Sequence, residues 1–181
     1  MAFPKKYAEF AARARVPLGF VIVALFLWLA RPSTVSLIAG GSVALCGLLI
    51  RAWAAGHLRK NQELAVSGPY AYVRNPLYVG TLTVGIGFAV AGAHPAIGLA
   101  LVVFFLALYL PVIEEEEAHL RKILKGYEDY EKNVPRVIPA LTTTYRSNVE
   151  FSAALYRKNR EYEAALGYLA GMLLLSWKAL G

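Results

Sequence analysis

Five apolar stretches, separated by polar connections, dominate this sequence. They cover residues 16–30, 34–54, 78–93, 95–113 and 164–180. A helix needs about 20 mostly apolar residues to cross a bilayer, so each stretch predicts a membrane-spanning helix. The first stretch is short unless the alanine-rich turn before it joins the helix. We therefore predict an all-α fold, a polytopic membrane helical bundle with about five transmembrane helices, built as a single domain over residues 1–181.

The composition supports a membrane protein and excludes other classes. Hydrophobic residues make up 57% of the chain and charged residues 17%, whereas soluble domains average about 45–50% and about 25%. This balance excludes a disordered chain and argues against a water-soluble fold. The single cysteine, Cys46, excludes an intramolecular disulfide. Neither His94 nor His119 has a partner at a metal-ligand spacing, so no metal site is predicted.

The net charge of +7 is distributed unevenly along the chain. Lysines and arginines precede the first apolar stretch and gather in residues 55–77 and 114–163, whereas only Arg31 and Lys178 fall on the other side. By the positive-inside rule, the N-terminus and both basic segments are predicted to face the cytoplasm. The positive charge then reflects membrane topology, and we expect membrane lipids as partners and no nucleic acid.

The connections on the opposite side, residues 31–33 and 92–95, are too short to hold an active site. Polar residues in quantity occur only in segments 55–77 and 114–163. The helical hairpin between these segments brings them together. We therefore predict an active site at the cytoplasmic surface, assembled from both segments.

Segment 55–77 ends in a turn and a helix start. Gly68-Pro69 is a turn signal, and Asn75-Pro76 predicts an N-cap followed by proline at the first helical position. The free N–H groups of such a helix start suit an anion. The alternative is structural: Asn75-Pro76 starts a membrane helix, and Tyr70, Tyr72 and Tyr78 form an interfacial aromatic belt.

Segment 114–163 opens with four consecutive glutamates, Glu114 to Glu117. The first and last of them lie three residues apart on one helix face, where like charges repel unless a cation neutralises them. Arg51, Arg59 and Arg74 are the candidate protein partners, and a cationic ligand is the alternative. In either case, the sequence predicts a positive charge against this run.

Together, the two segments resemble a known family, the integral-membrane methyltransferases typified by isoprenylcysteine carboxyl methyltransferase and the related phospholipid N-methyltransferases. That family carries an Arg-His-Pro-x-Tyr-x-Gly element at the start of one span and a Glu-Glu element after the next. The corresponding stretches here are Gly68-Pro69-Tyr70-Ala71-Tyr72-Val73-Arg74-Asn75-Pro76-Leu77-Tyr78-Val79-Gly80 and Ile113-Glu114-Glu115-Glu116-Glu117. The resemblance covers about residues 50–139.

The resemblance implies that S-adenosylmethionine binds in a cytosol-facing pocket between the third and fourth spans and the C-terminal segment. It implies Asn75 and Glu117 as catalytic residues. The cofactor-binding residues that it implies are Gln62, Val66, Tyr70, Arg74, Asn75, Pro76, Tyr78, Glu116 and Glu117. Asn75 replaces the family's histidine and so removes a titratable base. Val112 stands where the prenylcysteine enzymes carry an arginine, which argues against prenylcysteine as the acceptor.

The resulting hypothesis is an S-adenosylmethionine-dependent methyltransferase that acts on a lipophilic, membrane-borne acceptor. The sulfonium and ammonium groups of the cofactor are cations that the glutamate run can balance. Methyl transfer needs aligned reactants rather than a covalent nucleophile. Two alternatives stay open: an ethanolamine-type phospholipid N-methyltransferase, and a non-catalytic membrane scaffold or transporter whose glutamates only pair with arginines.

Overall fold

The computed structural model describes residues 3–145 and 148–180, and every regular element within them is helical. The elements are α1 (Lys5–Leu29), α2 (Thr34–Ala55), η1 (Gly68–Ala71), α3 (Pro76–Ala91), α4 (Pro95–Phe104), η2 (Phe105–Tyr109), α5 (Leu110–Ile123), α6 (Tyr127–Asn133), α7 (Ala153–Lys158) and α8 (Tyr162–Leu180). The predicted all-α bundle is confirmed. Positions 1–2, 146–147 and 181 of the single domain predicted for 1–181 lie outside the described residues.

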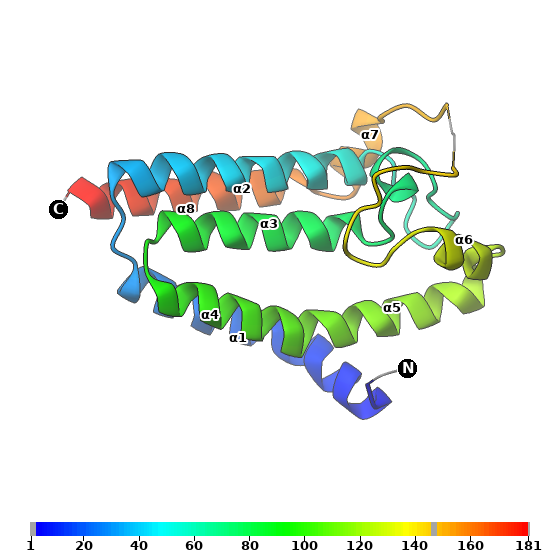
Figure 1. The fold of residues 1–181 in the computed structure, drawn as a ribbon, viewed down its shortest axis with the longest axis horizontal. Coiled ribbons are helices and arrows are strands. Elements are labelled where there is room, and N and C mark those ends of the chain that lie inside the picture. Colours follow the sequence, from blue (N-terminus) through cyan, green and yellow to red (C-terminus); the bar gives the residue numbers. More distant parts are fainter. Residues whose placement is uncertain (1–2, 146–147, 181) are drawn as a thin grey trace.

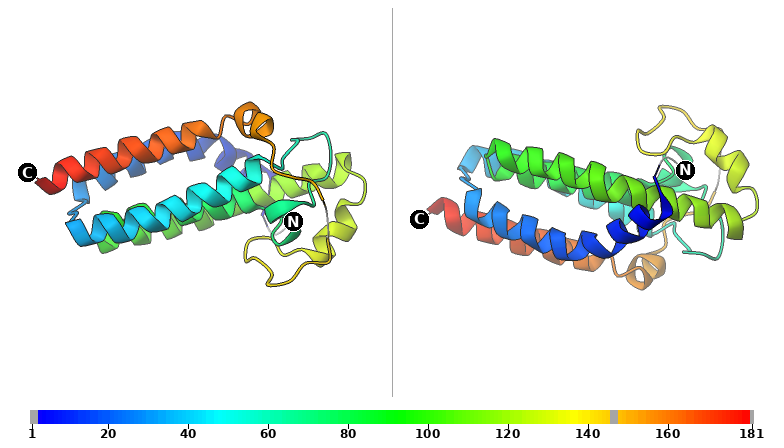
Figure 2. Two further views of the ribbon diagram at one scale, coloured as in Figure 1. Left: turned by 90° about the horizontal axis from the view of Figure 1, so that it is seen from above. Right: turned by 90° about the horizontal axis from the view of Figure 1, so that it is seen from below.

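The long helices run side by side along one axis (Figure 1). In Figure 1, α2, α3 and α8 form one side of the bundle, and α1 lies with α4 and α5 on the other. In the two views of Figure 2, α1 and α8 lie along one side, and α2 lies with the green helices along the other. The N-terminus, η1, α6, α7 and the long connections gather at one end, and the C-terminus lies at the opposite end. Polar chain is thus concentrated at a single end, which we call the polar end.

Three helical stretches are long and apolar enough to cross a membrane: α1, α2 and the continuous stretch Pro95–Ile123 formed by α4, η2 and α5. The alanine-rich turn does join α1, which begins at Lys5 rather than near residue 16. α3 is a shorter apolar helix of 16 residues. α8 has 19 residues and is not among the three. All five predicted spans form helices, and three of them meet both criteria.

Small residues bring α2 and α3 into backbone contact. A Cβ atom placed on Gly40 of α2 would lie 2.3 Å from the Ala91 nitrogen, and one on Gly87 of α3 would lie 2.3 Å from the Ala44 nitrogen. Real Cβ atoms essentially never lie this close to a non-bonded atom, so only glycine fits at these two positions. Such small-residue contacts are typical of helix pairs in membranes. Among the described residues, α2 and α3 make the most extensive contact between two helices.

A π-helical turn, η2, separates α4 from α5 and marks where α1 docks. Pro111 in α5 has no N–H to donate to the Ala107 carbonyl four residues earlier. The Tyr7 hydroxyl of α1 donates to that carbonyl oxygen at 2.8 Å. Ala11 of α1 is fully buried in an apolar cluster with Leu108. The first half of α1 is therefore held against η2 and α5.

α8 packs along α2 and ends beside α1. The Tyr168 hydroxyl donates to the Gly41 carbonyl at 3.2 Å, and Lys178 Nζ donates to the Leu27 carbonyl at 2.6 Å. Leu175 is fully buried in the cluster at that end of the bundle. The C-terminal helix thus belongs to the bundle, and its start is placed at the polar end.

Candidate functional site

The two polar segments meet at the polar end of the bundle, as the sequence predicts. The backbone N–H of Arg74 donates to the Pro135 carbonyl at 2.9 Å, and that of Ala140 donates to the Tyr72 carbonyl at 2.9 Å. The Tyr130 hydroxyl of α6 donates to the carbonyl of Tyr70 at 2.7 Å. Segments 55–77 and 114–163 therefore form one structural unit around the starts of η1 and α3.

Glu117 is fully buried at the centre of this unit. Its Oε2 accepts a hydrogen bond from Arg136 Nε at 3.0 Å and forms an ion pair with Arg136 Nη2 at 2.9 Å. Its Oε1 accepts a hydrogen bond from Asn75 Nδ2 at 2.9 Å and lies 3.5 Å from Arg74 Nε. Two guanidinium groups and an amide thus balance this carboxylate, which joins α5 to the start of α3.

Asn75 occupies the N-cap position of α3, but its side chain makes no capping hydrogen bond. Its Nδ2 donates to Glu117 and also to the Arg136 carbonyl at 3.1 Å. The predicted helix start is therefore correct, and the predicted N-cap is not made by the side chain. An N-cap would use the Oδ1 acceptor of this side chain, and the two hydrogen bonds from Nδ2 instead fix the side chain in an orientation in which Oδ1 does not cap the helix.

The other two arginines suggested by the sequence as partners of the glutamate run pair elsewhere. Arg59 Nε lies 3.2 Å from Glu63 on the surface. Arg51 of α2 forms a bidentate ion pair with Glu161. Its Nε donates to Oε1, and its Nη2 donates to Oε2 at 3.1 Å. Arg51 also donates to Thr81 and to the Leu77 carbonyl. This pair ties α2 and α3 to the start of α8.

A second ion-pair network lies beside Glu117. Glu131 of α6 is 2.7 Å from Arg121 Nη2 and 3.2 Å from Arg74 Nη1. The hydrogen bond from Arg121 lowers the pKa of the Glu131 carboxyl below its usual value. Arg74 therefore bridges Glu117 and Glu131, and the network fixes α6 against the end of α5.

Two tyrosines of α6 form part of the buried wall of the site. Tyr127, Tyr130 and Val134 are buried together, and Leu64 and Val66 pack against them. Burial raises the pKa of Tyr127 to about 12 and raises the pKa of Tyr130 still further. Both phenols are thus uncharged at physiological pH and can donate hydrogen bonds, as Tyr130 does to the Tyr70 carbonyl.

A cavity of about 840 Å³ lies inside this unit. Residues from α1, α2, α3, η2, α5, α6 and both polar segments line it. Its ionisable and aromatic lining includes Glu115, Glu116, Glu161, Arg15, Arg51, Arg74, His119, Tyr70, Tyr78, Tyr109, Tyr127 and Tyr130. Ala12, Leu77 and Val112 form apolar parts of the wall. The cavity therefore combines carboxylates, guanidinium groups and aromatic rings with an apolar side.

Most of the residues predicted for the cofactor line this cavity. They are Tyr70, Arg74, Asn75, Pro76, Tyr78 and Glu116. Gln62, Val66 and Glu117 are not in the lining. Gln62 is exposed, Val66 belongs to the tyrosine cluster, and Glu117 is turned toward the arginines. The structure thus separates Glu116, which faces the cavity, from its neighbour, which supports the wall.

Tyr78 lies at the point where the charged and apolar walls meet. Its hydroxyl lies near the Glu116 carboxylate, and Arg15 Nη1 donates to it at 3.5 Å. Its ring meets the ring of Tyr109 edge-on, with centroids 5.7 Å apart. Tyr109 comes from η2, and π-helical turns occur frequently at functional sites.

Sequence reasoning did not assign Arg15, Tyr109 or Glu161 to the site. Arg15 is one of several basic residues before the first span, and Tyr109 lies inside an apolar stretch. Glu161 lies 110 residues from its partner Arg51. For Tyr109, the proline two residues later was the available signal, because it marks an irregular helix.

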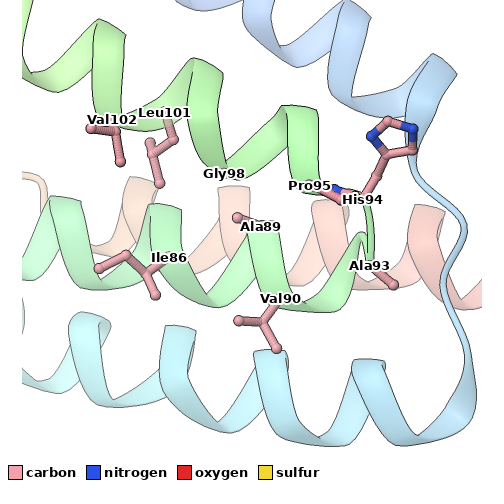
Figure 3. A pocket seen from close by; sticks show the side chains of 9 residues that line it. All are labelled: Ile86, Ala89, Val90, Ala93, His94, Pro95, Gly98, Leu101 and Val102. Carbon is pink, nitrogen blue, oxygen red and sulfur yellow. The ribbon is translucent and has the colours of Figure 1, made fainter.

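A smaller cavity of about 430 Å³ lies between α3 and α4 at the other end of the bundle (Figure 3). Apart from His94, the residues that line it are apolar. His94 Nδ1 accepts a hydrogen bond from the Ala96 N–H and so caps α4. This cavity has no charged side chain in its wall, so a charged ligand fits the larger cavity better.

Comparison with known proteins gives a family and two relatives. The profile of a family described as phospholipid methyltransferase matches residues 15–126. The chain is 32% identical over 105 residues to the cobalt-zinc-cadmium resistance protein CzcN of Cupriavidus metallidurans, with 57% of this chain and 47% of that protein covered. It is 26% identical over 157 residues to the nickel-cobalt-cadmium resistance protein NccN of Alcaligenes xylosoxydans xylosoxydans, with 78% and 72% covered. No solved structure matches the chain.

Two facts qualify these matches. The chain spans about half the length of CzcN. Both relatives are named for metal resistance, and residues 3–145 and 148–180 contain no group of three or more His, Cys, Asp or Glu side chains that could hold a metal ion.

The family match extends over more than half of the chain, from Arg15 in α1 to Gly126, just after α5. It includes the Asn75-Pro76 helix start and the run Glu114 to Glu117, the two motifs that meet at the polar end. The chain therefore belongs to the phospholipid methyltransferase family.

Proposed function

We propose that this protein transfers a methyl group from S-adenosylmethionine to a lipophilic, membrane-borne acceptor in the 840 Å³ cavity. The observation that carries the proposal is the lining of this cavity, which brings carboxylates and tyrosine rings from both family motifs together. Family membership supports the reaction type. By the positive-inside rule, the polar end and its cavity belong on the cytoplasmic side.

The residues present fit this cofactor. The cavity volume lies within the range of about 300–1,000 Å³ that is usual for small-molecule sites. S-adenosylmethionine carries two cations, which carboxylates and aromatic ring faces attract. Glu115 and Glu116 supply the carboxylates, and Tyr70 and Tyr78 supply rings. The cofactor's own carboxylate needs N–H donors. The guanidinium groups of Arg74 and Arg51 lie in the wall and can supply such donors in addition to their ion pairs with glutamates.

When bound, S-adenosylmethionine supplies a methyl group on a positively charged sulfur. Glu116 would balance that charge, and the Tyr78 hydroxyl lies near this carboxylate. Because the charge disappears during transfer, this carboxylate contributes to binding and orientation rather than to stabilising the transition state. The chief task of the protein is alignment, which can lower a barrier by about 7–11 kcal/mol.

The acceptor is proposed to occupy the apolar side of the cavity. Ala12, Leu77 and Val112 come from three helices that also form the apolar body of the bundle. Val112 in place of an arginine argues against prenylcysteine. The family description favours a phospholipid as the acceptor, and within that class an ethanolamine-type amine is the more specific proposal.

We expect the Glu116→Gln variant to lose its preference for the charged cofactor. The wild-type chain should bind S-adenosylmethionine more tightly than S-adenosylhomocysteine, which lacks the sulfonium charge. The variant should bind S-adenosylmethionine about tenfold more weakly and S-adenosylhomocysteine almost as before. Isothermal titration calorimetry of the full chain in detergent micelles measures both affinities.

The matched control is Glu128→Gln, which removes a carboxylate from the exposed side of α6. It should leave both affinities unchanged. Equal weakening of the two ligands by Glu116→Gln would place this carboxylate away from the sulfur. Absence of heat with either ligand at near-millimolar concentration, for the wild-type chain, would instead favour the non-catalytic scaffold.

A further inference from the structure

One face of α1 packs against the bundle and borders the large cavity. Ala8, Ala11, Ala12 and Arg15 follow the three- and four-residue spacing of a single helix face. Ala8 and Ala11 are buried against the bundle, and Ala12 and Arg15 line the large cavity. Arg13 lies on another face and is exposed. The two neighbouring arginines of α1 therefore have different surroundings, although either could extend toward lipid headgroups.

Arg15 differs from the other arginines of the cavity region in its partners. Arg51, Arg74 and Arg136 each lie within 4.0 Å of a carboxylate oxygen. Arg15 donates to the neutral Tyr78 hydroxyl at 3.5 Å. It has no carboxylate within 4.0 Å in the part of the chain that the structure describes. Its charge is therefore available to an anion in the cavity.

The surroundings of Arg15 indicate where such an anion would come from. Ala12 and Tyr78 pack with Phe104 against the buried cluster that contains Val112. Directly after Arg15, α1 continues as an apolar helix to Leu29. A guanidinium in partly apolar surroundings at the edge of a membrane helix favours an anionic partner. An anion attached to a hydrocarbon chain fits both the charge and the apolar wall.

We propose that Arg15 is a specificity-determining residue that binds an anionic group carried by the lipophilic acceptor. This inference rests on the proposed function, because it assigns the acceptor side of the same cavity. A group bound at Arg15 would lie next to the Tyr78 hydroxyl, in the same cavity that Glu116 lines. Arg15 would thus place the acceptor beside the carboxylate assigned to the cofactor's positive charge.

The test compares acceptor-side and cofactor-side binding in one preparation. The full chain is placed in phosphatidylcholine nanodiscs, and binding of radiolabelled dodecyl phosphate is measured for the wild type and for Arg15→Ala, Arg15→Lys and Arg13→Ala. Dodecanol serves as the neutral probe of equal chain length, and inorganic phosphate serves as the anion without a chain. Binding of S-adenosylhomocysteine is measured on the same samples.

We expect Arg15→Ala to weaken dodecyl phosphate binding about tenfold or more, because it removes charge-assisted hydrogen bonds. Arg15→Lys should recover part of the affinity, and Arg13→Ala should have no effect. Dodecanol binding should not depend on Arg15, and inorganic phosphate should compete poorly. Affinity for S-adenosylhomocysteine should stay constant, which shows that the variants are folded and that Arg15 does not hold the cofactor.

Several outcomes would overturn the inference. Equal loss of dodecyl phosphate in Arg13→Ala and Arg15→Ala would mean a general surface charge effect. Effective competition by inorganic phosphate would mean a site for free anions rather than for a lipid. Loss of S-adenosylhomocysteine binding in Arg15→Ala would assign this residue to the cofactor or to folding. Failure of the proposed function is a separate result, namely no S-adenosylhomocysteine binding by the wild-type chain.

Discussion

Replacing Glu117 by alanine is expected to lower the free energy of unfolding by about 3–5 kcal/mol. The carboxylate is fully buried and accepts hydrogen bonds from Arg136 and Asn75, with Arg74 at 3.5 Å. Its removal leaves Arg136 without this carboxylate partner and leaves Arg74 with its ion pair to Glu131. We expect a value toward the lower end of this range, because Arg136 is 39% exposed and water can solvate it. Denaturant unfolding in detergent micelles, followed by circular dichroism, measures the change.

The same variant should also weaken cofactor binding, although Glu117 does not line the cavity. Its partners Arg74 and Asn75 do line the cavity and would lose their fixed positions. Glu128→Gln again serves as the surface control and should change neither quantity. If Glu117→Ala unfolded at the same denaturant concentration as the wild type, this cluster would not hold the two polar segments together.

The second large effect is expected for Gly87→Ala, at the contact between α2 and α3. The added Cβ would lie 2.3 Å from the Ala44 nitrogen and 2.6 Å from the Gly40 carbonyl oxygen. Because both of these are backbone atoms of α2, the clash can be relieved only if the helices move apart. We expect a loss of about 1–3 kcal/mol or more in the free energy of unfolding. The denaturant titration described for Glu117 reports this loss as well.

Gly98 of α4 and Gly167 of α8 provide matched controls. A Cβ atom on either one meets no heavy atom within 4 Å. Alanine at these positions should leave stability unchanged or raise it slightly, by about 0.5–1 kcal/mol, because glycine is unfavourable within a helix. An equal loss in Gly98→Ala and Gly87→Ala would contradict the close α2–α3 contact as the cause.

Parts of the site could be predicted because they depend on local sequence and on chain connectivity. The hairpin of two apolar helices between segments 55–77 and 114–163 requires both segments to lie at the same end. This is why Arg74, Asn75 and Glu117 were correctly predicted to come from parts of the chain that meet. Gln62 and Val66 do not line the cavity. They lie in the connection between α2 and η1, where the backbone has no regular period from which the direction of a side chain could be predicted.

The sequence by itself determined the helices, their order and the end of the bundle where polar residues gather. The physical reason is that apolar length and backbone hydrogen bonding within a helix are local properties, and a membrane permits few other structures. Only the tertiary structure decided which side chains face the cavity. Glu116 and Glu117 differ by about 100° around α5, so that the first lines the cavity and the second accepts hydrogen bonds from Asn75 and Arg136. The partners Arg51 and Glu161 likewise meet only through packing, because nothing in either local sequence specifies the other.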